Sequence, residues 1–205
     1  MYTQLNESLL QDATLWLCTH DPALARVHEQ FGFPPLWARA PDFATLVHIV
    51  LEQQVSLSSA NAAFKRLKAL LPDFTPQAFL FLSDEQLRSI GFSRQKTLYT
   101  RNLAEYLLDG RLDLQTLHAL PDDEVRNTLT QLKGIGPWTA DIYLSECLLR
   151  PDVLPKGDIA MLEAFKDLYH LPNRPDHDTF VRSTAHWRPW RSVGTRLLWH
   201  YYLNR

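Results

Sequence analysis

Apolar residues recur at intervals of three and four along almost the whole 205-residue chain, and no stretch alternates apolar and polar residues as a half-buried strand does. The clearest series follows Asp42 and comprises Phe43, Leu46, Val47, Val50 and Leu51. Residue types that begin helices precede several of these series, namely Asp21-Pro22, Ser56 or Ser58, Ser83 with Gln86, and Ser93. We therefore predict an all-α protein.

The turn-rich segments divide this helical chain into parts. We expect one compact unit over residues 1–205 with two lobes and a cleft between them. Its parts are N-terminal helices over about 1–40, a helical lobe over about 41–130, and a third part over about 131–205. The third part is predicted to hold helices over roughly 138–149, 158–169, 177–186 and 189–203.

Composition excludes several classes of protein. Hydrophobic residues make up 45% of the chain, yet no apolar run approaches the roughly 20 residues that span a bilayer. The first residues are polar and acidic, unlike a secretion signal, and Cys18 and Cys147 lie on unrelated segments, so we expect a cytoplasmic protein with reduced thiols. A net charge of −2 argues against a polycationic nucleic-acid coat, but the basic residues gathered in 61–101 leave room for a local basic face.

The segment Leu132–Thr139 carries the most specific motif. Gly134 and Gly136 flank Ile135 and permit a tight turn with outward-facing amides, the geometry that holds a phosphate, while Ile135 is expected to enter the core. Pro137 suits the first turn of a following helix. A plain helix–helix turn is the alternative. A bulky residue in place of either glycine is expected to weaken binding of that phosphate and leave the fold mostly intact.

Residues Leu132–Ala140 and the loop that ends at Asp158 together resemble the helix-hairpin-helix DNA glycosylases of base excision repair, the HhH-GPD superfamily. Leu51–Ser56 and the segment from Trp187 to Trp199 add similarity to the branch of bacterial 3-methyladenine DNA glycosylase II, the AlkA type. The resemblance implies the helix-hairpin-helix glycosylase fold and double-stranded DNA with damaged bases as the partner.

The resemblance places Asp158 at the catalytic position. A carboxylate beside the sugar stabilises the positive charge that develops when an N-glycosidic bond breaks, and it orients the attacking water. Asp158 also precedes a predicted helix, so a purely structural role as its N-cap is the alternative, and one aspartate can fill both roles.

Trp138 and Trp199 match tryptophans of the family's base pocket, where aromatic faces bind a cationic alkylated purine. Core packing is the alternative for both. Trp138 stands where family members that also cut the strand carry a lysine, so the resemblance implies a glycosylase without lyase activity that leaves an abasic site.

Other positions match the family's DNA contacts. Gln54, with Gln53 beside it, matches the wedge that fills the gap left by a flipped base, although two exposed glutamines at a helix end are the alternative. Residues of the hairpin are expected to bind a DNA phosphate: Lys133, Gly134, Gly136 and Thr139. Backbone carbonyls are expected to hold a monovalent or divalent cation in some relatives, here those of Thr130, Leu132 and Ile135.

The resulting hypothesis is a monofunctional, monomeric DNA glycosylase for alkylated purines of the 3-methyladenine and 7-methylguanine class. No cofactor is required, no iron–sulfur cluster is expected because the C-terminal third holds only Cys147, and no membrane is involved. Two alternatives stay open. One is the same scaffold acting on other damaged bases, such as ethenoadenine or hypoxanthine, and the other is a non-catalytic module that binds damaged DNA.

Overall fold

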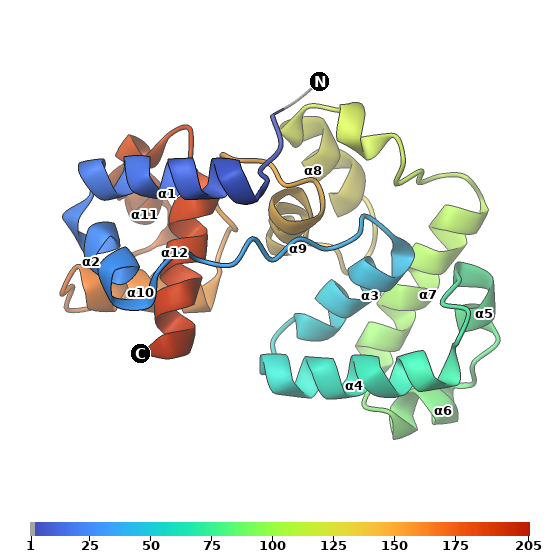
Figure 1. Ribbon diagram of the computed structural model, residues 1–205. Coiled ribbons are helices and arrows are strands. Elements are labelled where there is room, and N and C mark those ends of the chain that lie inside the picture. The colour runs from blue at the N-terminus through green and yellow to red at the C-terminus, as the bar shows by residue number, and fades with distance from the viewer. Residues whose placement is uncertain (1–2) are drawn as a thin grey trace. The chain divides into compact units, whose positions relative to one another are not determined.

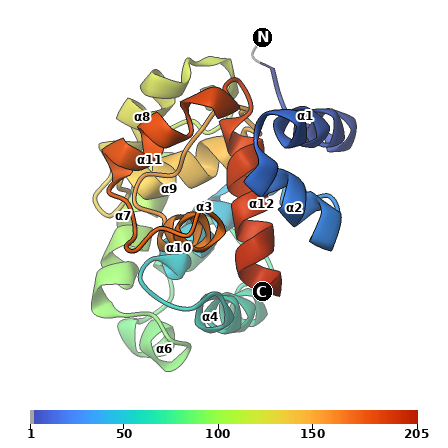
Figure 2. The ribbon, with the colours of Figure 1, turned by 90° about the vertical axis from the view of Figure 1, so that its left-hand side faces the viewer.

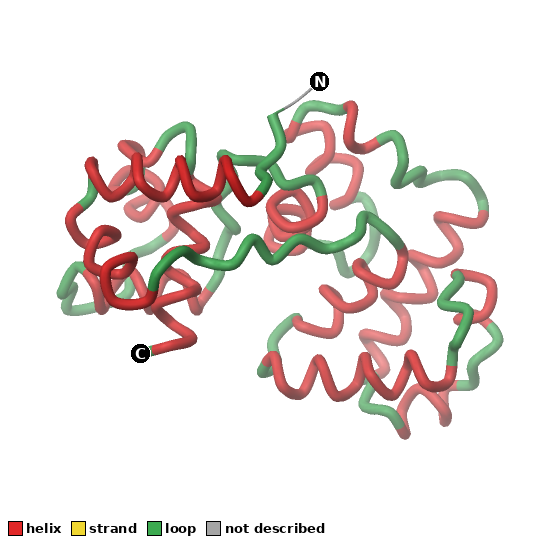
Figure 3. The backbone as a smooth tube through the Cα atoms, viewed as in Figure 1, coloured by secondary structure: helices red, strands yellow, loops and turns green. Residues whose placement is uncertain are grey.

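The computed structural model describes residues 3–205, and within them the chain forms twelve α-helices and no strand (Figure 3). The prediction of an all-α protein is confirmed. No helix in this range is long and apolar enough to cross a membrane. The chain divides into two units, one made of residues up to Ala38 together with Leu144–Arg205, the other of Arg39–Tyr143.

These units differ from the expected division of the sequence. The hairpin segment belongs with residues 39–143 and not with the C-terminal helices. The N-terminal helices join the C-terminal ones because α1 and α2 pack on α12. The expected cleft between lobes stays a prediction.

The first unit is built around the C-terminal helix α12, which packs against α10, α2 and α1 (Figures 1 and 2). Its core holds the aromatic rings of Phe165, Phe180 and Trp187, whose edge-to-face contacts add to the burial of apolar surface. The α-helices of this unit are α1 (Glu7–His20), α2 (Pro22–Phe31), α10 (Ile159–Leu168), α11 (His177–Ser183) and α12 (Arg191–Asn204).

A buried guanidinium fixes α12 within this unit. Arg196 donates to the carbonyl of Leu36 at 2.9 Å, to the hydroxyl of Ser145 at 3.0 Å and to the carbonyl of Ser145 at 2.7 Å. Burial lowers the pKa of Arg196 to about 10, although Glu146 acts in the opposite direction. Because a buried charge is costly unless its hydrogen bonds are satisfied, these contacts hold three segments in one arrangement.

The second unit is organised by α3, which packs against α4, α7 and α9. The predicted apolar face of α3, from Phe43 to Leu51, is buried as expected. The helices of this unit are α3 (Phe43–Glu52), α4 (Leu57–Leu70), α5 (Pro76–Leu80), α6 (Asp84–Ser89), α7 (Arg94–Leu108), η1 (Leu117–Ala119), α8 (Asp122–Thr130) and α9 (Pro137–Ile142).

Helix starts agree with the sequence. The capping box of Ser83 and Gln86 forms, and Ser56 caps α4. The helix predicted over 138–149 is present as α9 up to Ile142, followed without a break by a widened π-helical turn over Tyr143–Cys147. The carbonyl of Ser145 in that turn accepts from Arg196.

Asp21 joins several elements of the first unit. Its carboxylate caps α2 through the N–H of Ala23 and also accepts from Tyr169, His186 and the indole of Trp187. Burial alone would raise the pKa of Asp21, but the hydrogen bonds from these side chains bring it below its usual value. Burial, together with the hydrogen bond to Asp21, raises the pKa of the Tyr169 hydroxyl.

We predict that Asp21→Asn lowers the free energy of unfolding by about 2 to 3 kcal/mol at pH 6, because charged hydrogen bonds are lost from a buried site. A carboxylate whose pKa is lowered on folding stabilises the protein above its unfolded pKa, and this contribution is lost as the pH falls through the folded value. The difference between wild type and variant should therefore narrow below about pH 4 in urea unfolding at a series of pH values. A difference that stays constant down to pH 3 would contradict this role.

Candidate functional site

Asp158 lies at the start of α10 and is 8% exposed. Its Oδ1 accepts the N–H of Met161 at 2.7 Å, so the predicted N-cap is confirmed. The same oxygen accepts from Nε1 of Trp199 at 3.1 Å. A carboxylate that is mostly shielded from solvent and fixed by two donors has the preorganisation that charge stabilisation requires.

Trp199 reaches Asp158 from α12, and the sequence did not predict this contact. The indole ring is half-buried and meets the ring of Trp37 edge to face, with centroids 6.0 Å apart. Trp37 follows Leu36, whose carbonyl binds Arg196. Trp199 is therefore held on one side while its N–H holds Asp158; its contact with a base stays a prediction.

The predicted hairpin between α8 and α9 is present. Leu132 and Ile135 are buried beneath it, and the N–H of Ile135 donates to the carbonyl of Leu132 at 3.0 Å. Lys133 is exposed between them. Pro137 is the first residue of α9, as expected. The turn thus presents one cationic side chain while its apolar residues anchor it in the unit.

The two glycines of the hairpin have different surroundings. Gly134 has φ +93°, and a Cβ there would lie 2.0 Å from the ring of Tyr99 on α7. Gly136 has φ −94°, and a Cβ there would have no heavy atom within 4 Å. The expectation that either glycine can be replaced without damage to the fold is therefore wrong for Gly134, because sterics and backbone both require glycine there.

An ion pair joins the helices on either side of the hairpin. Nε of Arg126 on α8 donates to Oδ1 of Asp141 on α9 at 2.7 Å, and another nitrogen of the same guanidinium binds Asp123 at 2.8 Å. Asp141 is buried, so the pair is shielded from salt more than a surface pair is. This ion pair fixes the position of α8 relative to α9, the two helices that the hairpin connects.

Thr139 and Gln53 contact each other within the second unit. Thr139 is 1% exposed and its hydroxyl accepts from Gln53 at 2.9 Å, and its expected contact with a DNA phosphate stays a prediction. The Gln53 amide also donates to the carbonyl of Gly134 at 2.8 Å. Gln53 is therefore engaged inside its unit, and which of the two glutamines is the wedge stays a prediction. Gln54, which is exposed at φ +57°, is the one of the pair that faces solvent.

Trp138 is half-buried on α9, and its role in a base pocket stays a prediction. The carbonyls of Thr130, Leu132 and Ile135 are hard oxygen donors of the kind that alkali and alkaline-earth cations prefer, and that of Leu132 already accepts one hydrogen bond. No group of three His, Cys, Asp or Glu side chains among residues 3–205 is arranged to hold a metal ion. A cation here would therefore depend on backbone oxygens.

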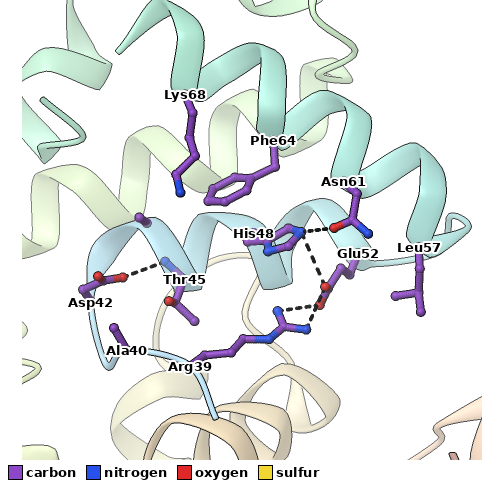
Figure 4. A pocket seen from close by; sticks show the side chains of 11 residues that line it. Arg39, Ala40, Asp42, Thr45, His48, Glu52, Leu57, Asn61, Phe64 and Lys68 are labelled. Carbon is purple, nitrogen blue, oxygen red and sulfur yellow. Dashed lines mark hydrogen bonds and ion pairs between the residues drawn. The ribbon is translucent and has the colours of Figure 1, made fainter. Parts of the chain in front are cut away.

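A polar hollow of about 480 Å³ lies between α3 and α4 (Figure 4). Arg39 binds the buried carboxylate of Glu52 through two hydrogen bonds of 2.9 and 3.1 Å. The ring of His48 stacks on Phe64 with centroids 4.2 Å apart, and its Nε2 lies 3.6 Å from Glu52. Burial lowers the pKa of His48, with Glu52 opposing the effect. The i,i+4 spacing of His48 and Glu52 is a sequence signal for their contact on one face of α3. No local pattern in the sequence indicates that Arg39 binds Glu52.

Comparison with known proteins places this arrangement in context. Residues 47–189 match the family model described as HhH-GPD superfamily base excision DNA repair protein. This match includes Leu51–Ser56, the hairpin between α8 and α9, and Asp158.

Several relatives that match most of the chain are described as 3-methyladenine DNA glycosylases. DNA-3-methyladenine glycosylase 1 of Schizosaccharomyces pombe is 29% identical over 77% of this chain and 71% of its own length. DNA-3-methyladenine glycosylase of Bacillus subtilis is 27% identical over 78% of this chain, which spans only 57% of that relative. The solved structure of the S. pombe 3-methyladenine DNA glycosylase Mag1 in complex with abasic DNA has a TM-score of 0.85 at 28% identity, covering 92% of this chain and 95% of that one.

The glycine environments generate a paired prediction. Gly134→Ala should lower the free energy of unfolding by about 2 to 4 kcal/mol, because it adds left-handed strain and a clash with the Tyr99 ring. Gly136→Ala should change it by less than about 1 kcal/mol, since the added methyl meets open space. Urea unfolding of the two variants beside wild type measures both; equal losses would contradict the difference in their surroundings.

Proposed function

Because the chain belongs to the HhH-GPD superfamily of base excision DNA repair proteins, we propose that it is a monofunctional DNA glycosylase for alkylated purines in duplex DNA. The reaction hydrolyses the N-glycosidic bond of bases of the 3-methyladenine and 7-methylguanine class and leaves an abasic site. The names of its relatives in fission yeast and Bacillus support this substrate class.

The observation that carries the proposal is the shielded carboxylate of Asp158, fixed by a backbone N–H and by Trp199. Binding of damaged DNA alone needs no acid at that point, since an anion beside a phosphodiester weakens association. Stabilising positive charge on a sugar does need one.

The chemistry follows from the charge on the substrate. The bond between C1′ and the base nitrogen breaks, its electron pair leaves with the base, and C1′ becomes oxocarbenium-like. An alkylated purine carries a positive charge and leaves as a neutral base, so no strong general acid is required. Asp158 stabilises the sugar cation and accepts a proton from the water whose oxygen bonds to C1′.

The substrate base must leave the helical stack before this reaction. Trp138 and Trp199 are proposed to bind the flipped cationic ring through their aromatic faces. Gln54 is proposed to occupy the gap in the duplex, which suits its exposed position at the end of α3.

The hairpin is proposed to bind one DNA phosphate through Lys133 and the backbone N–H groups near Gly134 and Gly136, a contact that fixes register without reading sequence. A monovalent or divalent cation on the carbonyls of Thr130, Leu132 and Ile135 would add positive charge at the same point. No cofactor is part of the reaction. The proposal further comprises a monomer that acts on double-stranded DNA in the cytoplasm.

We predict that Asp158→Asn slows single-turnover base release from a 3-methyladenine or 7-methylguanine duplex by roughly a hundredfold or more. Asp12→Asn, on the exposed face of α1, is the matched control and should behave as wild type. Binding of the same duplex should persist in Asp158→Asn. Equal rates for Asp158→Asn and wild type would contradict the catalytic role and favour a binding module.

Absence of lyase activity has a separate test. A Schiff base requires a lysine amine at the sugar, and Trp138 stands at the position that would supply it. Borohydride added during turnover should therefore trap no covalent protein–DNA adduct, while a bifunctional glycosylase run in parallel gives one. An adduct formed by wild type and lost in Lys133→Met would overturn the monofunctional assignment.

A further inference from the structure

The C-terminal end of α3 is tied to other segments at successive residues. The ammonium of Lys96, near the start of α7, donates to the carbonyl of Leu51 at 2.5 Å. The carboxylate of Glu52 accepts two hydrogen bonds from Arg39 (Figure 4). Leu51 and Glu52 are both buried, so neither tie is loosened by full exposure to water.

The next residue, Gln53, is tied to the hairpin. Its Nε2 lies 2.8 Å from the carbonyl of Gly134 and 2.9 Å from the hydroxyl of Thr139. A carbonyl oxygen only accepts, so the amide nitrogen must face Gly134 and the orientation of the amide is fixed by this contact. The ring of Tyr99 covers the same glycine from α7. Gln53 thus bridges the end of α3 and the hairpin.

Gln54 follows directly and is exposed in the left-handed region at φ +57°. This backbone conformation is unfavourable for a residue with a side chain and persists where the surrounding structure constrains it. The exposed Val55, with 46% of its surface accessible, continues the turn. The anchored residues 51–53 supply the constraint, and Gln54 receives its direction from them.

We propose that Gln53 is a positioning residue that couples the wedge residue Gln54 to the phosphate-binding hairpin. Residues Leu51–Gln53 form the anchored segment from which Gln54 projects. The DNA roles of Gln54 and of the hairpin rest on the proposed function. A phosphate contact sets the register of the duplex, and the bridge through Gln53 then sets the distance from that phosphate at which Gln54 enters the stack. Because contacts of Leu51–Gln53 fix the backbone that leads into Gln54 before DNA binds, the entropy cost of ordering that backbone does not reduce the free energy available for base flipping.

The test is a double-mutant cycle on the two adjacent glutamines. Gln53→Met and Gln54→Met make the same change of side chain at a bridged and at an exposed position. Each should slow single-turnover base release roughly tenfold. The double variant should be no slower than about twice the worse single variant, since a misplaced wedge and an absent wedge are one defect.

Controls separate positioning from general damage. Gln11→Met, on the exposed face of α1, should match wild type in every assay. Affinity for an undamaged duplex should change less than about threefold in Gln53→Met, since Ile135 and Leu132 still anchor the hairpin. If Gln53→Met does not fold, Thr139→Val removes one acceptor of the same amide and takes its place in the cycle. Losses that multiply in the double variant, or an equal loss of affinity and release, overturn the proposal.

A second readout does not depend on catalysis. A duplex with a tetrahydrofuran abasic analogue beside 2-aminopurine reports unstacking through fluorescence, and the same non-additive pattern is expected there. If the two substitutions have non-additive effects on fluorescence but the wild-type protein releases no base, the proposed function is contradicted and the coupling is supported. If the wild-type protein releases base but the effects of the two substitutions multiply independently, the proposed function is supported and the coupling is contradicted. A wild-type protein that binds neither duplex overturns both.

Discussion

The first unit depends on one buried guanidinium. Arg196 is fully buried and binds the carbonyl of Leu36 together with the carbonyl and hydroxyl of Ser145, so α12, the π-helical turn and the segment before Ala38 share one charged centre. Trp199 lies one turn further along α12 and holds Asp158. Removal of this guanidinium would leave buried polar groups unsatisfied, so Arg196 helps to fix the helix from which Trp199 holds the carboxylate of Asp158.

The second unit follows the same physical rule at the elements proposed to contact DNA. Arg126 and Asp141 join the helices that flank the hairpin, and the Gln53 amide joins the hairpin to α3. Each contact places a polar group where burial makes its loss expensive. Buried polar contacts therefore hold the proposed wedge segment, the hairpin and Asp158 in place, as groups that act with little rearrangement require.

Local signals were readable from the sequence, and long-range ones were not. The caps formed by Asp158 and Ser83 were predictable because a side chain reaches an N–H only three residues away. Burial of Ile135 followed from its place between two glycines. The bridge from Gln53 to Gly134 joins residues 81 positions apart, and the Trp199–Asp158 contact joins residues 41 apart, so no local pattern encodes either. The contact between Gln53 and Thr139, 86 positions apart, was unreadable for the same reason.

Substrate class is the central claim, and it is tested most directly without assuming a lesion. DNA treated with a methylating agent is incubated with the protein, and the bases set free are identified by mass. Release of 3-methyladenine and 7-methylguanine above the spontaneous rate, with no release from untreated DNA, is the predicted result. Release confined to ethenoadenine, hypoxanthine or other bases without an added methyl group in parallel samples, or no release from a protein that binds the treated DNA, would contradict it.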